Sequence, residues 1–411
     1  MSSVLRYGRL WRLPSSTRVA TIAIACALSG AVACTDSPLA PGHELPSTTD
    51  AGTTLRWNLI ARQLVTTESM TPPRAARAYA NLSVAQYLAA RAVFERRAEL
   101  TETPDETRAL LRAAIASASA EAISYLFPSH ALIAAHELAF QLDALGDSLA
   151  SAHAIETGRA IGIEAASAAI ERAAGDGADA SWSGTAPSGP YFWSGSNPQE
   201  PHWGAVRPWL TTSGSALRAP PPPEPGSEAF LAALEEVHTL AQNRTQEQLD
   251  EVLYWADGPR TPTPAGHWND LAARLIDDHA LSEEEAVAVL ARMNMAVMDA
   301  VIGCWDSKFT YWLIRPYQVD PEIRTPIGQP PHPSYPSGHA CMSGAASAVL
   351  GTVFPTEATR LAAMEQAACD SRVYAGIHYR FDSEAGQRLG AAAAELAIAA
   401  YLPTLARSLV P

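Results

Sequence analysis

Apolar residues recur along most of the chain at the three- and four-residue spacing of amphipathic helices. After Thr71-Pro72 one helix face carries Ala75, Ala78, Tyr79, Leu82, Tyr87 and Leu88. A capping box with proline at the first helical position opens the next run at Thr103-Pro104-Asp105-Glu106, and this run stops near Phe127-Pro128. Ala-rich amphipathic stretches predict further helices over 131–145 and 148–174. No segment alternates with the period of a strand, so the pattern predicts an all-α, multi-helix bundle.

The segment 176–227 interrupts the helical pattern with Gly, Ser and a run of four prolines. It nevertheless carries the large aromatic residues Trp182, Tyr191, Phe192, Trp193, Trp203 and Trp209. Because a disordered linker rarely has so many aromatics, we expect a long ordered loop packed across the bundle. The alternative is that this segment separates two independent domains. Helices resume near Ser227, and Ser282 with three following glutamates caps a long helix.

Composition narrows the class of protein further. The 411 residues carry a net charge of −14, and no run of Lys or Arg is present, which argues against a nucleic-acid partner. A mean hydropathy of −0.03, without a long apolar run beyond the first forty residues, excludes a multi-span membrane protein.

The N-terminal segment has the pattern of an export signal. Its basic residues are Arg6, Arg9, Arg12 and Arg18. They precede a short apolar stretch that ends at residue 33, so we expect 1–33 to be a signal peptide. This resembles a bacterial lipoprotein signal in which Cys34 is lipidated, with ordinary cleavage at the same place as the alternative. A flexible tether over 34–52 and a helical domain over 53–411 are then expected in the periplasm or outer envelope, with a membrane tether through Cys34.

Removal of this leader leaves three cysteines in the body, Cys304, Cys341 and Cys369. In an oxidising compartment they permit one disulfide and one unpaired thiol, and their spacing does not choose between the pairings. No CxxC or Cys/His cluster indicates a structural zinc site.

The motif block 308–382 contains three clusters of polar residues that indicate an oxyanion site. Lys308 and Arg315 are seven residues apart, about two helical turns, so both cations should project from one face at the end of the long helix. Ser337 and Gly338 should lie at a helix N-terminus, where free N–H groups and the helix dipole favour an anion. Arg372 adds a third cation with a planar donor fork.

Together these cations would repel a divalent metal ion, so the bound species should be a tetrahedral or trigonal-bipyramidal anion. His378 and Asp382 are four residues apart, so in a helix the carboxylate can accept from Nδ1–H and leave Nε2 free. His339, at a helix N-terminus among cations, should have a lowered pKa and move protons near neutrality.

The three clusters read K-x6-RP, then PSGH, then SR-x3-G-x-H-x3-D. This three-part signature resembles that of the superfamily that joins vanadium-dependent haloperoxidases and type 2 phosphatidic acid phosphatases, an all-helical fold. The segments 254–258, 264–268 and 330–336 and the Trp-rich middle look like the haloperoxidase branch.

The resemblance implies a role for each site residue. Vanadate, or phosphate in its place, would be bound by Lys308, Arg315, Ser337, Gly338 and Arg372. His378 would be the ligand of the vanadium, His339 would act as general acid and base, and Lys308 would polarise the peroxide. Asp257 resembles a carboxylate that orients the second arginine. His332 occupies a place near the vanadate where a polar group would favour bromide or iodide.

We therefore expect an exported vanadium-dependent haloperoxidase that oxidises a halide with hydrogen peroxide to hypohalous acid, which then reacts with a small organic acceptor. The alternative enzyme is an acid or phospholipid phosphatase with His378 as nucleophile. A non-catalytic envelope lipoprotein is the alternative outside enzymes, although a scaffold would not need buried cations without a ligand. Family members are often homodimers, but no interface can be identified from this sequence.

Overall fold

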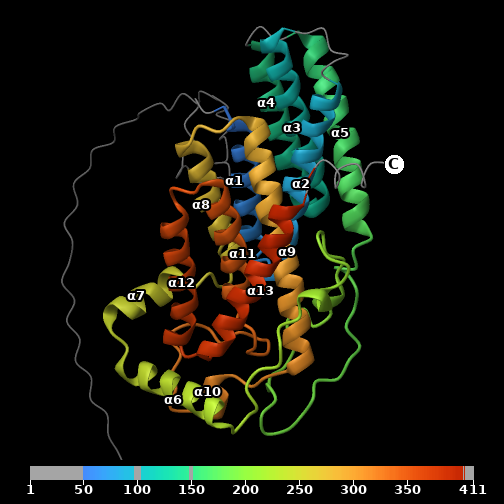
Figure 1. The fold of residues 1–411 in the computed structure, drawn as a ribbon. Helices are drawn as coiled ribbons and strands as arrows, with labels where there is room; N and C mark the ends of the chain where they lie inside the picture. The colour runs from blue at the N-terminus through green and yellow to red at the C-terminus, as the bar shows by residue number, and fades with distance from the viewer. Residues whose placement is uncertain (1–49, 97–102, 148–150, 401, 403–411) are drawn as a thin grey trace, which may run out of the picture. The chain divides into compact units, whose positions relative to one another are not determined.

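The computed structural model describes residues 50–96, 103–147, 151–400 and 402, which belong to one compact unit (Figure 1). Thirteen α-helices lie within these residues. Their one strand-like pairing is an isolated antiparallel bridge between Phe192 and Leu313. The all-α prediction is confirmed. The predicted signal peptide, Cys34 and most of the predicted tether lie outside the described residues.

The first five helices agree with the hydrophobic pattern. They are α1 (Gly52–Thr67), α2 (Pro72–Arg96), α3 (Pro104–Leu126), α4 (Ala131–Asp147) and α5 (Ala152–Ala174), with the 3₁₀ turn η1 (Pro128–His130) before α4. The capping box at Thr103 and Glu106 is present. Helices α3 and α5 approach closely because Gly158 and Gly162 face the backbone of α3.

The segment 176–227 is an ordered loop, as predicted, with two 3₁₀ turns, η2 (Trp203–Ala205) and η3 (Gly214–Leu217). Asp299 of the long helix accepts hydrogen bonds from the backbone N–H groups of Trp209, Leu210 and Thr211, at 2.7–3.2 Å. The Ser307 hydroxyl likewise accepts from Ala219 N–H at 3.0 Å. Buried polar groups that are satisfied in this way hold an irregular segment in one position.

The second half of the chain forms α6 (Glu228–Asn243), α7 (Gln246–Tyr254), α8 (Thr263–Asp278), α9 (Glu283–Tyr311), α10 (Pro316–Val319), α11 (Gly338–Val353), α12 (Ala358–Tyr374) and α13 (Arg380–Ala399). Helix α9 is the central helix, since it packs against α2, α11, α13, η2 and η3 (Figure 1). Among the described residues it alone has the length and apolar character of a membrane span, and 89% of its most apolar window is buried inside the fold. It therefore has the character of a core helix.

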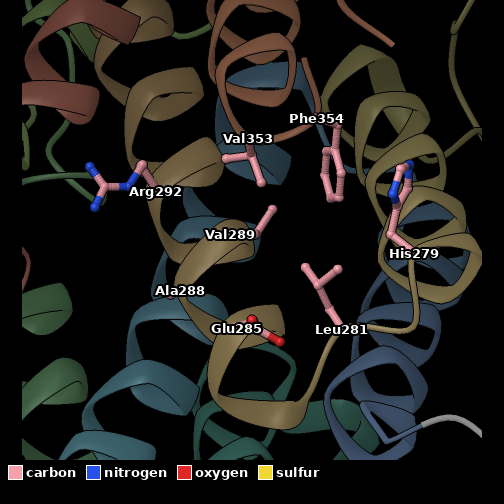
Figure 2. A pocket seen from close by; sticks show the side chains of 8 residues that line it. All are labelled: His279, Leu281, Glu285, Ala288, Val289, Arg292, Val353 and Phe354. Carbon is pink, nitrogen blue, oxygen red and sulfur yellow. The ribbon is translucent and has the colours of Figure 1, made fainter. Parts of the chain in front are cut away.

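A pocket of about 430 Å³ opens where the turn between α8 and α9 meets the end of α11 (Figure 2). Its lining is mainly apolar, with Leu281, Val289 and Phe354 facing one another and His279, Glu285 and Arg292 at its margin. Arg292 also donates to the carbonyl oxygens of Ala397 and Ile398 at the end of α13. None of the predicted site residues lines this pocket.

The close approach of α3 and α5 gives a test of the fold. A Cβ at Gly162 would lie 2.2 Å from the Ala114 carbonyl oxygen, so Gly162→Ala must push the helices apart. We expect the free energy of unfolding to fall by about 2 kcal/mol in urea titrations. Gly146→Ala in α4 is the control, because a Cβ there meets nothing within 4 Å and should leave stability equal or slightly higher. Equal stability of the two variants would contradict the packing.

Candidate active site

Four segments of the C-terminal half meet at the predicted oxyanion site. They are the end of α9, the loop over 331–337 that leads into α11, the end of α12, and the turn that leads into α13. The side chains of Lys308, Arg315, Arg372, His378 and Asp382 are all at most 2% exposed. The clusters recognised in the sequence therefore form one buried group in space.

Lys308 lies in the last turn of α9 and is fully buried. Its ammonium group donates to the carbonyl oxygens of Pro333, Ser334 and Pro336, at 2.9, 2.8 and 2.5 Å. Burial lowers the pKa of Lys308 to about 8, and Arg315 adds to this shift by repulsion. All three donors are used by the loop, so an anion would have to replace one carbonyl oxygen to be bound by this side chain.

Arg315 does not share a helix face with Lys308, and this part of the sequence prediction was wrong. Helix α9 ends at Tyr311 because Trp312 is left-handed, with φ 51°, so Arg315 lies beyond the helix as the N-cap residue of α10. The extended backbone carries its guanidinium into the site from a different direction. There it donates to the carbonyl oxygens of His332 and Ile377, at 2.9 and 2.6 Å.

His378 and Asp382 are paired, as predicted, at 2.8 Å between Nδ1 and Oδ2. The predicted reason was wrong, because His378 precedes α13 and Asp382 lies in its first turn. Oδ2 also accepts from the Ser334 hydroxyl at 2.5 Å. Burial raises the pKa of Asp382 to about 6, so the carboxylate is ionised at neutral pH and only accepts hydrogen bonds. The His378 proton is therefore on Nδ1, and Nε2 carries the lone pair.

The Nε2 of His378 accepts a long hydrogen bond from Arg315 Nη1, at 3.4 Å. The Nε2 lone pair could bind the electron-poor central atom of an oxyanion. The adjacent Arg315 guanidinium could bind the negatively charged oxygens of the same oxyanion. Burial, reinforced by Arg315 and Lys308, lowers the pKa of His378 well below its ordinary value and keeps the ring neutral.

Ser337 and Gly338 lie at the N-terminus of α11, as predicted. The Ser337 hydroxyl caps the helix by accepting from Ala340 N–H at 3.5 Å, and Ser337 N–H donates to the Asp382 carbonyl oxygen at 3.0 Å. The first N–H groups of a helix, here from Gly338 onward, have no intrahelical acceptor. They and the helix dipole add to the positive potential of the site.

His339 follows in the first turn of α11. Its Nε2 is buried and has no hydrogen-bond partner among the described residues, while the ring interacts with the backbone of Trp255. Burial and then the charge of Arg372 lower its pKa well below the ordinary value, so the ring is neutral. A buried unpaired nitrogen costs free energy, which a ligand that exchanges a proton with it would recover.

Arg372 is held at the end of α12 by the Ser371 hydroxyl and the Val252 carbonyl oxygen, at 3.0 and 3.2 Å. Burial lowers its pKa to about 10, and the charge of Asp257 opposes that shift. Asp257, which was predicted to orient Arg372, thus acts on it through its charge. The hydrogen-bonding partner of the Asp257 carboxylate is His267, at 3.3 Å.

His332 is buried in the loop beside the site. Its Nδ1 accepts from Arg315 Nη2 at 3.1 Å, and its ring lies against Trp305 with centroids 5.2 Å apart. Burial together with Lys308 and Arg315 lowers its pKa well below the ordinary value. The side chain is therefore a neutral polar group whose place is fixed by the second cation of the site.

Sequence reasoning missed three contributors, Ser334, His267 and Cys304. Ser334 lies within the stretch 330–336 that carried the resemblance, but no role could be predicted for it because its hydroxyl acts through Asp382, 48 residues away. His267 lies within the stretch 264–268 that carried the resemblance, and its ring stacks on Trp255 with centroids 4.3 Å apart. Cys304 was considered only as one of the three body cysteines, and nothing in the sequence placed it beside the site. All three body cysteines are buried free thiols, so the disulfide that their number permits is not formed among the described residues.

Comparisons with known proteins agree with this geometry. Residues 287–404 match the model of the PAP2 superfamily. The structure resembles that of the first bacterial vanadium-dependent iodoperoxidase, with a TM-score of 0.68 and 23% identity over 87% of this chain and 97% of that one. No curated protein matches the sequence.

Two further solved structures share the fold. The holo form of a bacterial vanadium-dependent chloroperoxidase has a TM-score of 0.63 and 14% identity over 83% of this chain and 94% of that one. The apo form has a TM-score of 0.61 and 15% identity over 85% and 94%. The all-helical fold of these haloperoxidases is therefore the fold of this chain.

The neutral histidines predict how stability depends on pH. His339 is uncharged in the folded protein but protonates below about pH 6.5 when unfolded, so the unfolded state binds more protons in acid. The contribution of this residue is present above that pH and is lost as the pH falls. Relative to His339→Gln, the wild type should lose about 1.4 kcal/mol of unfolding free energy per pH unit between about pH 5.5 and 4.5. Urea titrations measure this difference, and parallel curves would contradict a neutral His339.

Proposed function

We propose that this protein is a vanadate-dependent haloperoxidase, which oxidises a halide with hydrogen peroxide. The observation that carries the proposal is the extent of the structural likeness. The PAP2 match covers 287–404, whereas the likeness to the haloperoxidase structures covers 83–87% of the chain and includes the upstream helices. A protein that needed the C-terminal domain only for phosphoryl transfer would not require this shared upstream bundle.

The residues present fit a vanadate ion. The Nε2 of His378, which carries the lone pair, suits the vanadium centre, while Arg315, Arg372 and the N–H groups at the start of α11 suit its oxygens. The unpaired Nε2 of His339 supplies a site for a proton. Lys308 would join these donors by exchanging one of its carbonyl partners. Bound vanadate would supply activation of hydrogen peroxide toward attack by a halide.

The remaining residues prepare the site for this chemistry. Asp382 fixes the His378 proton on Nδ1, so that Nε2 stays free as a ligand. His339 Nε2 is neutral and can accept the proton that an incoming peroxide loses and return it to a departing oxygen. The buried cations hold developing negative charge without reorganisation of solvent.

The halide proposal rests on His332. A neutral imidazole fixed by Arg315 offers a polar surface beside the site, which would favour a large, easily oxidised halide over chloride. We therefore include bromide or iodide in the proposal. Export to the periplasm or outer envelope, with a tether through Cys34, completes the proposal and rests on the N-terminal sequence alone.

The activity is tested with purified protein that has been stripped of anions and reconstituted with orthovanadate. We expect vanadate-dependent bromination of a dione dye by hydrogen peroxide and a loss of at least about 100-fold in His378→Ala, because that variant lacks the nitrogen ligand. Hydrolysis of an aryl phosphate without halogenation would favour the phosphatase instead. A protein that neither reacts nor binds vanadate would be a non-catalytic scaffold.

The role of His332 is tested by the halide ratio. In His332→Phe we expect bromide turnover relative to chloride to fall by about tenfold, since loss of one polar contact is worth about 1.4 kcal/mol. Steady-state rates with each halide at equal vanadate occupancy give this ratio. Phe354→Leu, in the remote pocket of Figure 2, serves as a control that should keep the wild-type ratio. An unchanged ratio in His332→Phe would remove His332 from the halide proposal.

A further inference from the structure

Cys304 and Cys341 form a buried pair of thiols directly beneath the loop of the active site. Cys304 lies in α9, one turn before Lys308, and Cys341 lies in the first turn of α11. Both are completely buried, and the Cys341 thiol is hydrogen-bonded to Cys304. Cys304 in turn donates from Sγ to the Pro336 carbonyl oxygen at 3.8 Å.

The Pro336 carbonyl oxygen links these thiols to the anion-binding residues. It also accepts the 2.5 Å hydrogen bond from Lys308, and Pro336 immediately precedes Ser337 at the start of α11. A change at Cys304 therefore acts on a carbonyl oxygen that also holds Lys308 and belongs to the residue immediately before the N-cap of α11. A single peptide group, that of Pro336, thus separates the Cys304 sulfur from the residues that would bind the anion.

The charges around Cys304 favour its reaction as a thiolate. Burial raises the pKa of this thiol, but the hydrogen bond from Cys341 and the charge of Lys308 outweigh that effect and hold it below the ordinary value. The third cysteine, Cys369 in α12, has the opposite surroundings. Burial and the acidic neighbours Glu365 and Asp370 raise the pKa of Cys369 well above the ordinary value. The protein thus contains its own unreactive control.

We propose that Cys304 and Cys341 are a redox modification site that hydrogen peroxide converts to a disulfide, with weaker anion binding as the consequence. The proposal rests on the proposed function only for the identity of the oxidant, since a haloperoxidase works in the presence of peroxide.

The oxidation proceeds in two balanced steps. The Cys304 thiolate attacks one oxygen of hydrogen peroxide, the O–O bond breaks, and the products are a sulfenic acid and hydroxide, which takes the thiol proton as water. The Cys341 sulfur then attacks the sulfenic sulfur, the S–S bond forms, and the S–O bond breaks to release a second water. Two thiols and one peroxide give one disulfide and two water molecules.

The disulfide removes the S–H donor from the Pro336 carbonyl oxygen and joins α9 to the first turn of α11. Lys308 then becomes the main partner of that oxygen and is less free to exchange it for an oxygen of the anion. Loss of one hydrogen bond at this position should weaken orthovanadate binding by about fivefold.

The first experiment maps the thiols after the purified protein is treated with hydrogen peroxide in the absence of halide and vanadate. Unreacted thiols are alkylated under denaturing conditions and the peptides are analysed by mass spectrometry. We expect a Cys304–Cys341 cross-linked peptide, two hydrogens lighter than the reduced pair, and a free Cys369. Cys369→Ser should give the same cross-link, while Cys304→Ser and Cys341→Ser should give none. Because the mapping needs no halide or vanadate, its result is independent of the haloperoxidase activity.

The second experiment compares orthovanadate binding by calorimetry before oxidation, after it, and after reduction with dithiothreitol. We expect a reversible, about fivefold rise in Kd in wild type and Cys369→Ser, and no peroxide effect in Cys341→Ser. Full alkylation of Cys304 and Cys341 after peroxide treatment would overturn the proposal. So would oxidation of Cys304 to a sulfinic acid without loss of the Cys341 thiol, or a Kd that does not respond to the disulfide.

Discussion

The burial of three cations in a helical bundle is the constraint on which the rest of the site depends. Lys308, Arg315 and Arg372 are at most 1% exposed, and Asp382 is the one buried carboxylate among the residues described around them. Hydrogen bonds to backbone carbonyl oxygens, in place of further carboxylates, offset the cost of burying these three charges. This arrangement keeps the site positive, because dipoles stabilise the cations without cancelling their charge.

The same constraint explains the irregular backbone around the site. A helix uses its own carbonyl oxygens, so it has none to offer to Lys308 or Arg315. The loop over 331–337 is neither helix nor strand and therefore presents successive carbonyl oxygens to these cations. Its three prolines and two serines suit an irregular segment whose carbonyl oxygens stabilise charge. The histidines of the site stay neutral for the same reason, since they lie among cations with no water to stabilise a further charge.

The helices, and the residues that form the site, could be predicted from the sequence. The directions from which these side chains reach the site could not. Capping boxes at Thr103 and Ser282 and apolar spacing are local signals, and they gave helix starts that the structure confirms. Arg315 was placed on a helix because spacing alone does not reveal that Trp312 adopts a left-handed conformation. Ser334 and His267 depend on contacts with residues distant in sequence, and no local pattern encodes such contacts. The pairing of His378 with Asp382 followed from spacing although the helix begins two residues later than that argument assumed.

The hydrogen bonds of the loop over 176–227 limit which fragments of this domain could keep the site intact. Gln199 N–H donates to the Pro331 carbonyl oxygen at 2.8 Å, and the Trp305 indole donates to the Gln199 carbonyl oxygen at 3.1 Å. Val252 and Trp255 reach Arg372 and His339 from the same upstream half. A fragment cut at residue 287 would keep every signature motif but lose the partners that orient them. The recognisable motif block therefore depends on upstream segments for the orientation of its side chains, and a graft of it onto another scaffold would have to carry these segments too.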